Sequence, residues 1–223
     1  PELEDLEALP LLRLEGDGYA RGVMYGRAKA SSWQRAARLM DAHAEELVRE
    51  VVPPRFIAEA VVKEVPAHLA QRFCGTSSFR ADEYFPAEYR GYVQGIADGA
   101  GLPAERILRL IAFVMLSDAS CSGFVAFGPA TEDGRLLQLR SLDWGSDALP
   151  AAEEAVLLVH EPTGGQRYLS IGFVGLVGSI TGINESGISL TEIGADSTDW
   201  TADGIPMPLL LERVLAEAHT LDE

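Results

Sequence analysis

The stretch "CSGFVAFGPATEDGRLLQLRSLDW", residues 121–144, decides the fold. At this point the helical recurrence of apolar residues gives way to the alternation that is typical of strands. Residues 121–128 and 135–144 predict two strands, and the "TEDG" segment at 131–134 predicts the turn between them. The stretch is therefore a hairpin that begins with a cysteine.

Two more hairpins are predicted further along the chain. Residues 153–161 pair with 166–173, and residues 175–183 pair with 188–194. Three successive hairpins indicate an antiparallel meander rather than the parallel sheet that alternating strands and helices form. The apolar pattern at 206–219 predicts a helix that covers one face of the sheet.

The first 120 residues are predicted to be mostly helical after a short strand at 11–16. Prolines at 53 and 54 end the first helical run, because proline cannot continue a helix. No flexible linker separates the two halves, so we expect one domain over 1–223. The expected helical runs are 19–52, 55–73, 86–101 and 103–120.

Composition excludes several classes of partner. The 223 residues carry a formal net charge of −16, which disfavours nucleic acid and anionic membrane surfaces. The apolar runs are too short for a membrane span. No phosphate-binding loop, zinc motif or serine-hydrolase elbow is present, and the four histidines are isolated in sequence. We therefore predict no cofactor and no metal.

One glycine-rich segment needs a decision between two interpretations. "GDGYARG" (16–22) is one residue off the dinucleotide fingerprint, but no strand–helix–strand context follows it. We prefer a strand-to-helix turn that requires glycine for positive φ or for close packing.

Both ends of the sequence raise an expectation about the natural protein. The chain begins at Pro1 without a methionine, which indicates that an upstream segment has been removed. The helical pattern at 206–223 stops without a cap or breaker, so we expect the protein to continue. Localisation stays open, with the cytoplasm favoured over secretion or the periplasm.

Residue chemistry alone leaves two interpretations of Cys121. Charges in an apolar strand are costly unless they are paired or functional, which draws attention to Arg140 and Asp143. Ideal alternation places Arg140 and Leu142 on one face and Ser141 and Asp143 on the other. The segment is thus either a buried cysteine with a nearby salt bridge or a reactive site.

The same segment resembles the nucleophile region of the N-terminal-nucleophile cysteine hydrolases. That group contains the acyl-coenzyme A:isopenicillin-N acyltransferases and the choloylglycine (bile salt) hydrolases. The shared pattern is a cysteine, a strand, a "DG" turn, a strand and "RNxD", with Ser141 here where asparagine is usual. Other segments are similar to the acyltransferase-like branch and occur in the same order. They lie before the cysteine at 14–26 and 91–102, and after it at 172–194 and 206–223.

The resemblance implies a fold and a maturation step. The fold is the α+β four-layer αββα sandwich of antiparallel sheets, with its second sheet incomplete in this chain. The Cys121 thiol would attack the carbonyl of Ser120 and split the precursor. The helical segment 1–120 and the strand-rich segment 121–223 would then stay associated.

The implied mechanism needs no histidine. A thiol with an ordinary pKa of ~8.5 is a poor nucleophile at neutral pH. A freed α-amino group has an ordinary pKa of ~7.7 to 8.0 and can act as the base for that thiol. By resemblance, Asp143 would orient the α-amino group of Cys121, and Arg140 would favour the thiolate. The acyl group of an amide would pass to sulfur as a thioester and then to water or to an acceptor amine.

Five more residues are candidates for the site, and some of them also have an ordinary structural interpretation. Asn184 is the visible candidate for an oxyanion donor, although "NESG" (184–187) is also an ordinary hairpin turn. Glu192 is a candidate to face the site where bile salt hydrolases have asparagine. Phe124, Trp144 and Phe173 suit an acyl or aryl pocket, and core packing explains them at least as well.

We therefore expect an enzyme that hydrolyses or transfers the acyl group of a small N-acylated substrate. An acyl-coenzyme A-dependent N-acyltransferase is the alternative enzyme. A non-catalytic binding or scaffold protein that keeps the fold is the alternative outside the enzymes.

Overall fold

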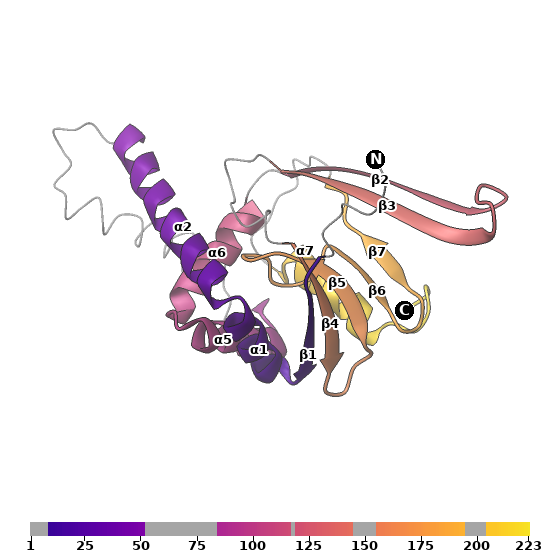
Figure 1. Ribbon diagram of the computed structural model, residues 1–223, viewed down its shortest axis with the longest axis horizontal. Coiled ribbons are helices and arrows are strands. Elements are labelled where there is room, and N and C mark those ends of the chain that lie inside the picture. Colours follow the sequence, from indigo (N-terminus) through magenta and orange to yellow (C-terminus); the bar gives the residue numbers. More distant parts are fainter. Residues whose placement is uncertain (1–8, 52–83, 117–118, 145–154, 195–203) are drawn as a thin grey trace.

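A computed structural model describes residues 9–51, 84–116, 119–144, 155–194 and 204–223, with only the backbone described at 43–51, 112–116, 119–120 and 144. The chain is an α+β protein with one mixed sheet and a second, smaller antiparallel sheet (Figure 1). In the described residues no helix is both long and apolar enough to cross a bilayer.

The described part of the N-terminal half contains a strand followed by helices, as predicted. These are β1 (Leu11–Gly16), α1 (Gly18–Ala28), α2 (Ala30–Val51), α5 (Ala87–Ala100) and α6 (Ala104–Leu116). The long run expected over 19–52 is instead broken at Lys29, whose φ of −117° and ψ of 28° are not helical. The helix expected at 55–73 lies outside the described residues.

Helices α1 and α5 pack backbone to backbone along two glycine rows. A Cβ atom added to Gly22 would lie 2.1 Å from the carbonyl oxygen of Tyr92, and one added to Gly95 would lie 2.2 Å from that of Tyr19. Gly16, with φ of 101°, makes the turn between β1 and α1. The "GDGYARG" segment therefore has the turn and packing role that its spacing indicated. The two rows are Gly18, Gly22 and Gly26 on α1 and Gly91, Gly95 and Gly99 on α5.

The larger sheet has the strand order β1-β4-β5-β6-β7. The second and third predicted hairpins form an antiparallel meander through β4 (Val156–Pro162), β5 (Tyr168–Gly172), β6 (Thr181–Asn184) and β7 (Ser189–Thr191), whereas the first predicted hairpin forms the separate smaller sheet. The sheet is mixed because β1 joins β4 in parallel, a pairing that requires a long crossover such as the helical segment between them. The first strand of the third hairpin begins at Thr181, later than the expected 175.

The core lies between the helices and the sheet. Buried residues of α6 and β4 meet there, together with the segment that follows β5. Helix α7 (Met207–Glu217) contacts β6 and β7 and buries Leu209 and Leu215, as its apolar pattern predicted. The residues that anchor this core include Ile107, Leu110, Ile111, Val156, Leu158, Val174 and Val177.

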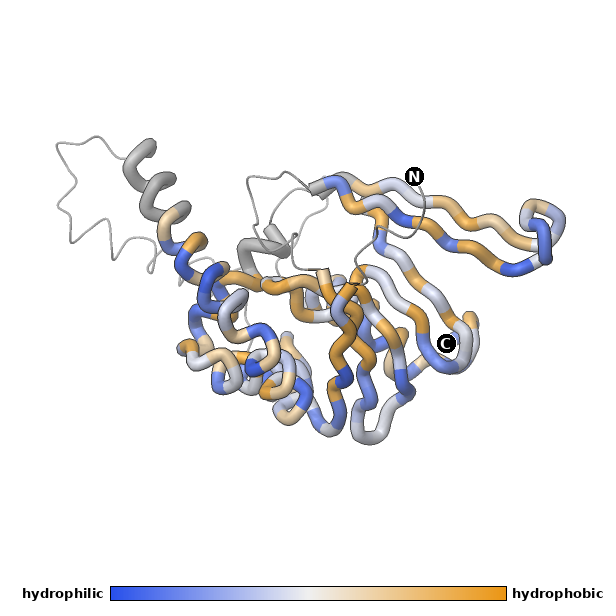
Figure 2. The backbone as a smooth tube through the Cα atoms, in the orientation of Figure 1, coloured by the Kyte–Doolittle hydropathy of each residue, from blue (hydrophilic) through white to orange (hydrophobic). Residues whose placement is uncertain are grey.

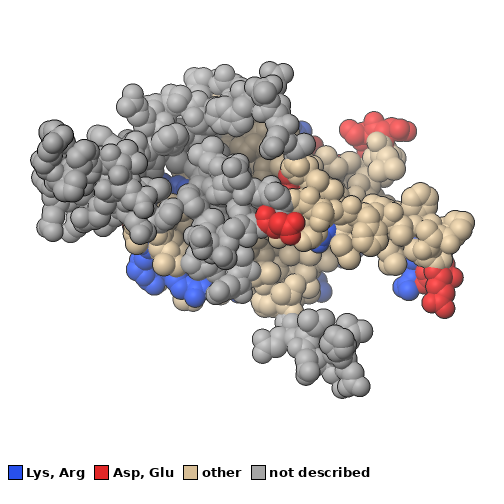
Figure 3. Space-filling model, turned by 90° about the horizontal axis from the view of Figure 1, so that it is seen from above, with Lys and Arg blue, Asp and Glu red and all other residues tan. Residues whose placement is uncertain are grey.

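The smaller sheet is the predicted hairpin, formed by β2 (Ala119–Gly128) and β3 (Gly134–Trp144). It projects beyond the larger sheet next to β7 (Figure 1). Along its length it is largely hydrophobic (Figure 2), and charged atoms gather at its tip (Figure 3). Six large apolar side chains are each 50% to 64% exposed, namely Phe124, Val125, Phe127, Leu136, Leu137 and Leu139. Exposure on this scale is unusual for an ordinary protein surface.

Candidate functional site

Strand register places the Cys121 thiol beside the Arg140 guanidinium. Cys121 pairs with Leu142, and Gly123 pairs with Arg140, so these four residues share one face of the hairpin. The Nη2 atom of Arg140 donates a hydrogen bond to Cys121 Sγ at 3.0 Å. A Cβ atom added to Gly123, which lies on the same face, would be 2.9 Å from the carbonyl oxygen of Leu139 and 3.3 Å from the side chain of Ile193.

Glu192 reaches the same point from the end of β7. Its Oε2 atom lies 3.0 Å from Arg140 Nη2 and accepts a hydrogen bond from the Cys121 thiol at 3.7 Å. Arg140 Nε also donates to the backbone carbonyl of Glu192 at 3.0 Å. The side chain of Arg140 is 7% exposed and that of Glu192 is 17% exposed. Together they form a compact group of a thiol, a guanidinium and a carboxylate.

This geometry suits thiolate chemistry. A positive guanidinium next to sulfur stabilises the thiolate, which is the nucleophilic form of cysteine. A carboxylate that accepts the thiol hydrogen bond can receive its proton. Cys121 is a free cysteine, so its sulfur is available for reaction.

Asp143 lies on the opposite face of the strand from Arg140, as alternation predicted, and the register therefore also places it opposite the Cys121 thiol. Its register partner is Ser120, and its Oδ1 atom accepts a hydrogen bond from Ser141 Oγ at 2.8 Å. Among the described residues no hydrogen bond joins Asp143 to Cys121 Sγ. Asp143 is therefore placed beside the peptide bond that precedes Cys121 rather than beside the sulfur.

Asn184 was considered both as an oxyanion donor and as part of the "NESG" hairpin turn, and in the structure its side chain makes the contacts of the turn. Its Nδ2 donates to the carbonyl of Ala218 at 2.9 Å, and its Oδ1 accepts from the backbone N–H of Ile188 at 3.0 Å. The residue is 5% exposed. Its amide thus closes the turn between β6 and β7 and holds the end of α7.

The aromatic candidates do not gather around the thiol. Phe124 lies on the hairpin face opposite Cys121 and is 59% exposed. Phe173 is buried in the core, which is the alternative that the sequence left open for it. Trp144 is described only by its backbone, opposite Ala119.

Comparisons with known proteins find similarity along nearly the whole chain. It is 28% identical over 230 residues to protein dcd1A of Dictyostelium discoideum, a match that covers 96% of this chain and 51% of that protein. It is 23% identical over 226 residues to protein dcd1B of the same organism, covering 99% of this chain and 45% of that protein. The chain thus spans about half the length of these relatives.

A third similar protein is archaeal and uncharacterized. It comes from Archaeoglobus fulgidus, is 29% identical over 204 residues, and is matched over 81% of this chain and 32% of its own length. A scan against known protein families finds no match.

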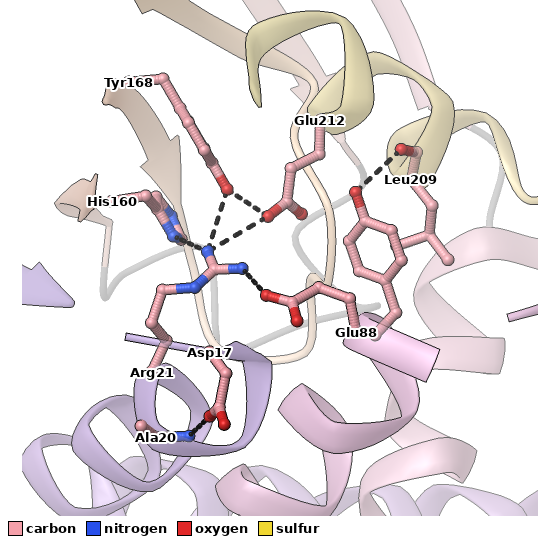
Figure 4. A network of polar contacts seen from close by, with 9 residues as sticks. Asp17, Ala20, Arg21, Glu88, His160, Tyr168, Leu209 and Glu212 are labelled. Atoms are coloured by element: carbon pink, nitrogen blue, oxygen red, sulfur yellow. Dashed lines mark hydrogen bonds and ion pairs between the residues drawn. The ribbon is translucent and has the colours of Figure 1, made fainter. Parts of the chain in front are cut away.

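A second polar cluster, which sequence reasoning missed, centres on Arg21 of α1 (Figure 4). Arg21 is 3% exposed and donates to His160 Nδ1 at 2.8 Å, to the Tyr168 hydroxyl at 3.1 Å and to Glu88 Oε1 at 2.7 Å. Glu212 of α7 lies 3.7 Å from Arg21 Nη1 and accepts a hydrogen bond from Tyr168. The cluster joins α1, α5, β4, β5 and α7, so no single stretch of sequence contains it. Charges inside otherwise apolar elements, such as Glu212, were the available signal.

The contacts of the cluster determine the protonation of His160. Because a guanidinium can only donate, His160 Nδ1 must accept, which leaves Nε2 to donate to Ser170 Oγ at 3.3 Å. Burial, followed by the charge of Arg21, lowers the pKa of His160 well below its ordinary value. Burial raises the pKa of Glu212, against the opposing effect of Arg21. His160 is thus held neutral and does not serve as a base for Ser170.

Proposed function

We propose that this protein is a self-activating cysteine amidohydrolase or acyltransferase that acts on the C–N amide bond of a small N-acylated substrate. The observation that carries the proposal is the 3.0 Å hydrogen bond from Arg140 Nη2 to the sulfur of Cys121, at the start of a strand-forming segment. The resemblance of residues 121–144 to a nucleophile segment supports the same assignment.

In the proposed reaction the chain first splits between Ser120 and Cys121. Cys121 then has a free α-amino group, which takes the thiol proton and returns it to the leaving amine. Asp143 supports this arrangement, because it is the register partner of Ser120 and so lies one position from the new terminus. Its carboxylate can orient the α-amino group once Ser120 no longer occupies that place.

In the next step the sulfur of Cys121 accepts the acyl group of the substrate. The thiolate, held by Arg140, attacks the amide carbonyl of the substrate, and the C–N bond breaks as the protonated amine leaves. The acyl group remains on Cys121 as a thioester. Water or an acceptor amine attacks that thioester and restores the thiol, so the protein needs no cofactor for this cycle.

The proposed fold is the αββα sandwich of the N-terminal-nucleophile hydrolases. The five-stranded sheet with its helices would supply one half, and the hairpin β2–β3 would begin the second sheet. The exposed apolar side chains of the hairpin support this assignment, because a two-stranded hairpin is marginal in water unless something packs on it.

Denaturing mass measurement of the purified protein tests the proposal. We expect two pieces, one ending at Ser120 and one beginning at Cys121, whereas Cys121→Ala stays whole. Ser122→Ala is the matched control, because Ser122 is exposed and lies on the other face of the hairpin. A wild-type chain that never splits, or a Cys121→Ala variant with full amidase activity, would contradict the proposal.

A second measurement identifies the substrate class. The protein is mixed with N-acyl amides of increasing acyl length, quenched in acid and weighed, and we expect an acyl increment on the piece that begins with Cys121. Added amine that accelerates loss of this increment indicates acyl transfer, and loss at an unchanged rate indicates hydrolysis. Acyl-coenzyme A in place of the amide tests the alternative donor.

A further inference from the structure

The first splitting event lacks the base that later turnovers would use. In the uncut chain the nitrogen of Cys121 is part of a peptide bond, and strand β2 runs through it from Ala119 to Gly128. A peptide nitrogen does not accept a proton at neutral pH. Self-cleavage therefore requires another group that can take the proton of the Cys121 thiol.

Two side chains have hydrogen bonds to this sulfur in the described part of the chain, Arg140 and Glu192. Arginine stays protonated and has no acceptor, so it cannot take the proton. His160, a conventional base, is engaged with Arg21 and Ser170 in the other cluster. This leaves the Glu192 carboxylate, which already accepts the thiol hydrogen bond at 3.7 Å.

We infer that Glu192 is the general base of the self-cleavage step, an inference that rests on the proposed function. The thiol proton passes to Glu192 Oε2 while Sγ attacks the carbonyl carbon of Ser120. The C–N bond between Ser120 and Cys121 breaks, and Glu192 returns the proton to the leaving nitrogen. The resulting thioester of Ser120 on Sγ is hydrolysed by water to a carboxylate and a free thiol.

The position of Arg140 makes this proton transfer favourable. Its Nη2 atom lies 3.0 Å from Glu192 Oε2 and 3.0 Å from Cys121 Sγ. As the proton leaves sulfur, the negative charge moves from the carboxylate to the sulfur and stays beside the same guanidinium nitrogen. No buried ion pair is lost on the way, so the electrostatic cost that such a loss carries is avoided.

Glu192 is also held rigidly for this role. Its backbone N–H donates to the carbonyl of Ile180 at 2.8 Å, and its own carbonyl accepts from Arg140 Nε. After cleavage the α-amino group of Cys121 takes over as base. Glu192 is consequently required for maturation more strongly than for turnover.

The test follows splitting of the freshly synthesised full chain by denaturing mass measurement over time. Glu192→Gln keeps the shape of the side chain and removes the basic oxygen, and we expect splitting to slow by about 100-fold or more. Glu192→Ala should be equally slow and should be accelerated by added formate, which supplies a replacement carboxylate. Glu185→Gln, which breaks only the exposed pair with Arg167, is the matched control and should split like the wild type.

The wild-type chain provides a readout that does not depend on variants. With Glu192 as base, the thiol proton has an acceptor 3.7 Å away and its removal does not depend on hydroxide, so the rate of splitting should vary little between about pH 6 and pH 8. A rate that rises about tenfold per pH unit would mean that hydroxide generates the thiolate, and would overturn the inference.

The other outcomes distinguish a failure of the role of Glu192 from a failure of the proposed function. Splitting of Glu192→Gln at the wild-type rate, with Cys121→Ala still whole, would overturn the role of Glu192 and leave the proposed function standing. A wild-type chain that never splits would overturn both. If Glu192→Gln does not fold, the role of Glu192 as the base is tested by the response of Glu192→Ala to formate and by the pH dependence of splitting in the wild-type chain.

Discussion

Arg140 Nη2 lies 3.0 Å from Cys121 Sγ, on the face of the hairpin that both residues share with Gly123 and Leu142. The two residues are diagonal neighbours on one face of the hairpin rather than direct partners. The contact spans this diagonal through the long side chain of Arg140, whose Nη2 donates to the sulfur. A buried cation is thereby held against a free thiol.

Replacing Arg140 should make the thiol less reactive. In Arg140→Gln the sulfur loses its cationic neighbour and faces Glu192 alone, so we expect alkylation of Cys121 by iodoacetamide at neutral pH to slow by about 10-fold. Arg140→Lys should recover part of the rate. Arg135→Gln at the exposed hairpin tip is the control. An Arg140→Gln rate equal to that of the wild type would mean that the guanidinium has no effect on the thiol.

Gly95→Ala should separate α1 from α5. The new methyl group would lie 2.2 Å from the carbonyl oxygen of Tyr19 and 2.8 Å from the nitrogen of Val23, both of them backbone atoms that cannot rotate away. We expect a loss of about 2–3 kcal/mol in the free energy of unfolding, measured in urea by circular dichroism. Gly91→Ala, with its closest contact at 3.2 Å, should cost clearly less. Equal losses would show that the helices can move apart freely.

Asn184→Asp should affect stability rather than chemistry. The aspartate can still accept from the Ile188 N–H, but it cannot donate to the carbonyl of Ala218. We expect the free energy of unfolding to fall by about 1–3 kcal/mol, with splitting and Cys121 alkylation unchanged. Unchanged stability combined with loss of acyl transfer would instead support the oxyanion role considered for Asn184.

His160→Asn should change how stability depends on pH. Burial lowers the pKa of His160 in the folded state, so below about pH 6.5 the unfolded chain takes up a proton that the folded chain does not. Wild-type stability therefore falls relative to the variant as pH decreases, by up to about 1.4 kcal/mol per pH unit. Asparagine can still accept from Arg21, and it has no proton to gain.

Urea unfolding at about pH 7.5 and pH 5.5 measures this effect. We expect the variant to be less stable at the higher pH and the difference to shrink at the lower pH. Glu212 has a raised pKa, so it removes stability as pH rises, but it is present in both proteins and largely cancels in the comparison. His219→Asn is the exposed control, and a difference that stays constant with pH would contradict the burial of a neutral His160.

Local patterns predicted much of the fold. The "TEDG" turn and the alternation on either side of it predicted the hairpin β2–β3 within two residues at each end. The glycines of "GDGYARG" indicated close packing, which α5 provides. The break at Lys29 was missed because the apolar periodicity continues through it, although the backbone changes direction. The parallel pairing of β1 with β4 was missed because no short-range signal specifies a partner that distant.

By itself, the sequence determined where helices change to strands and that Arg140 and Asp143 lie on opposite faces of their strand, whereas the register of the folded hairpin placed Cys121 on the face of Arg140. These are local properties that turn chemistry and side-chain alternation set. Only the tertiary structure decided that Glu192, rather than Asp143, contacts the sulfur, and that Arg21 gathers partners from four other elements. Such contacts depend on how β7 and α7 pack against distant segments, and burial of apolar surface across the whole fold determines that packing.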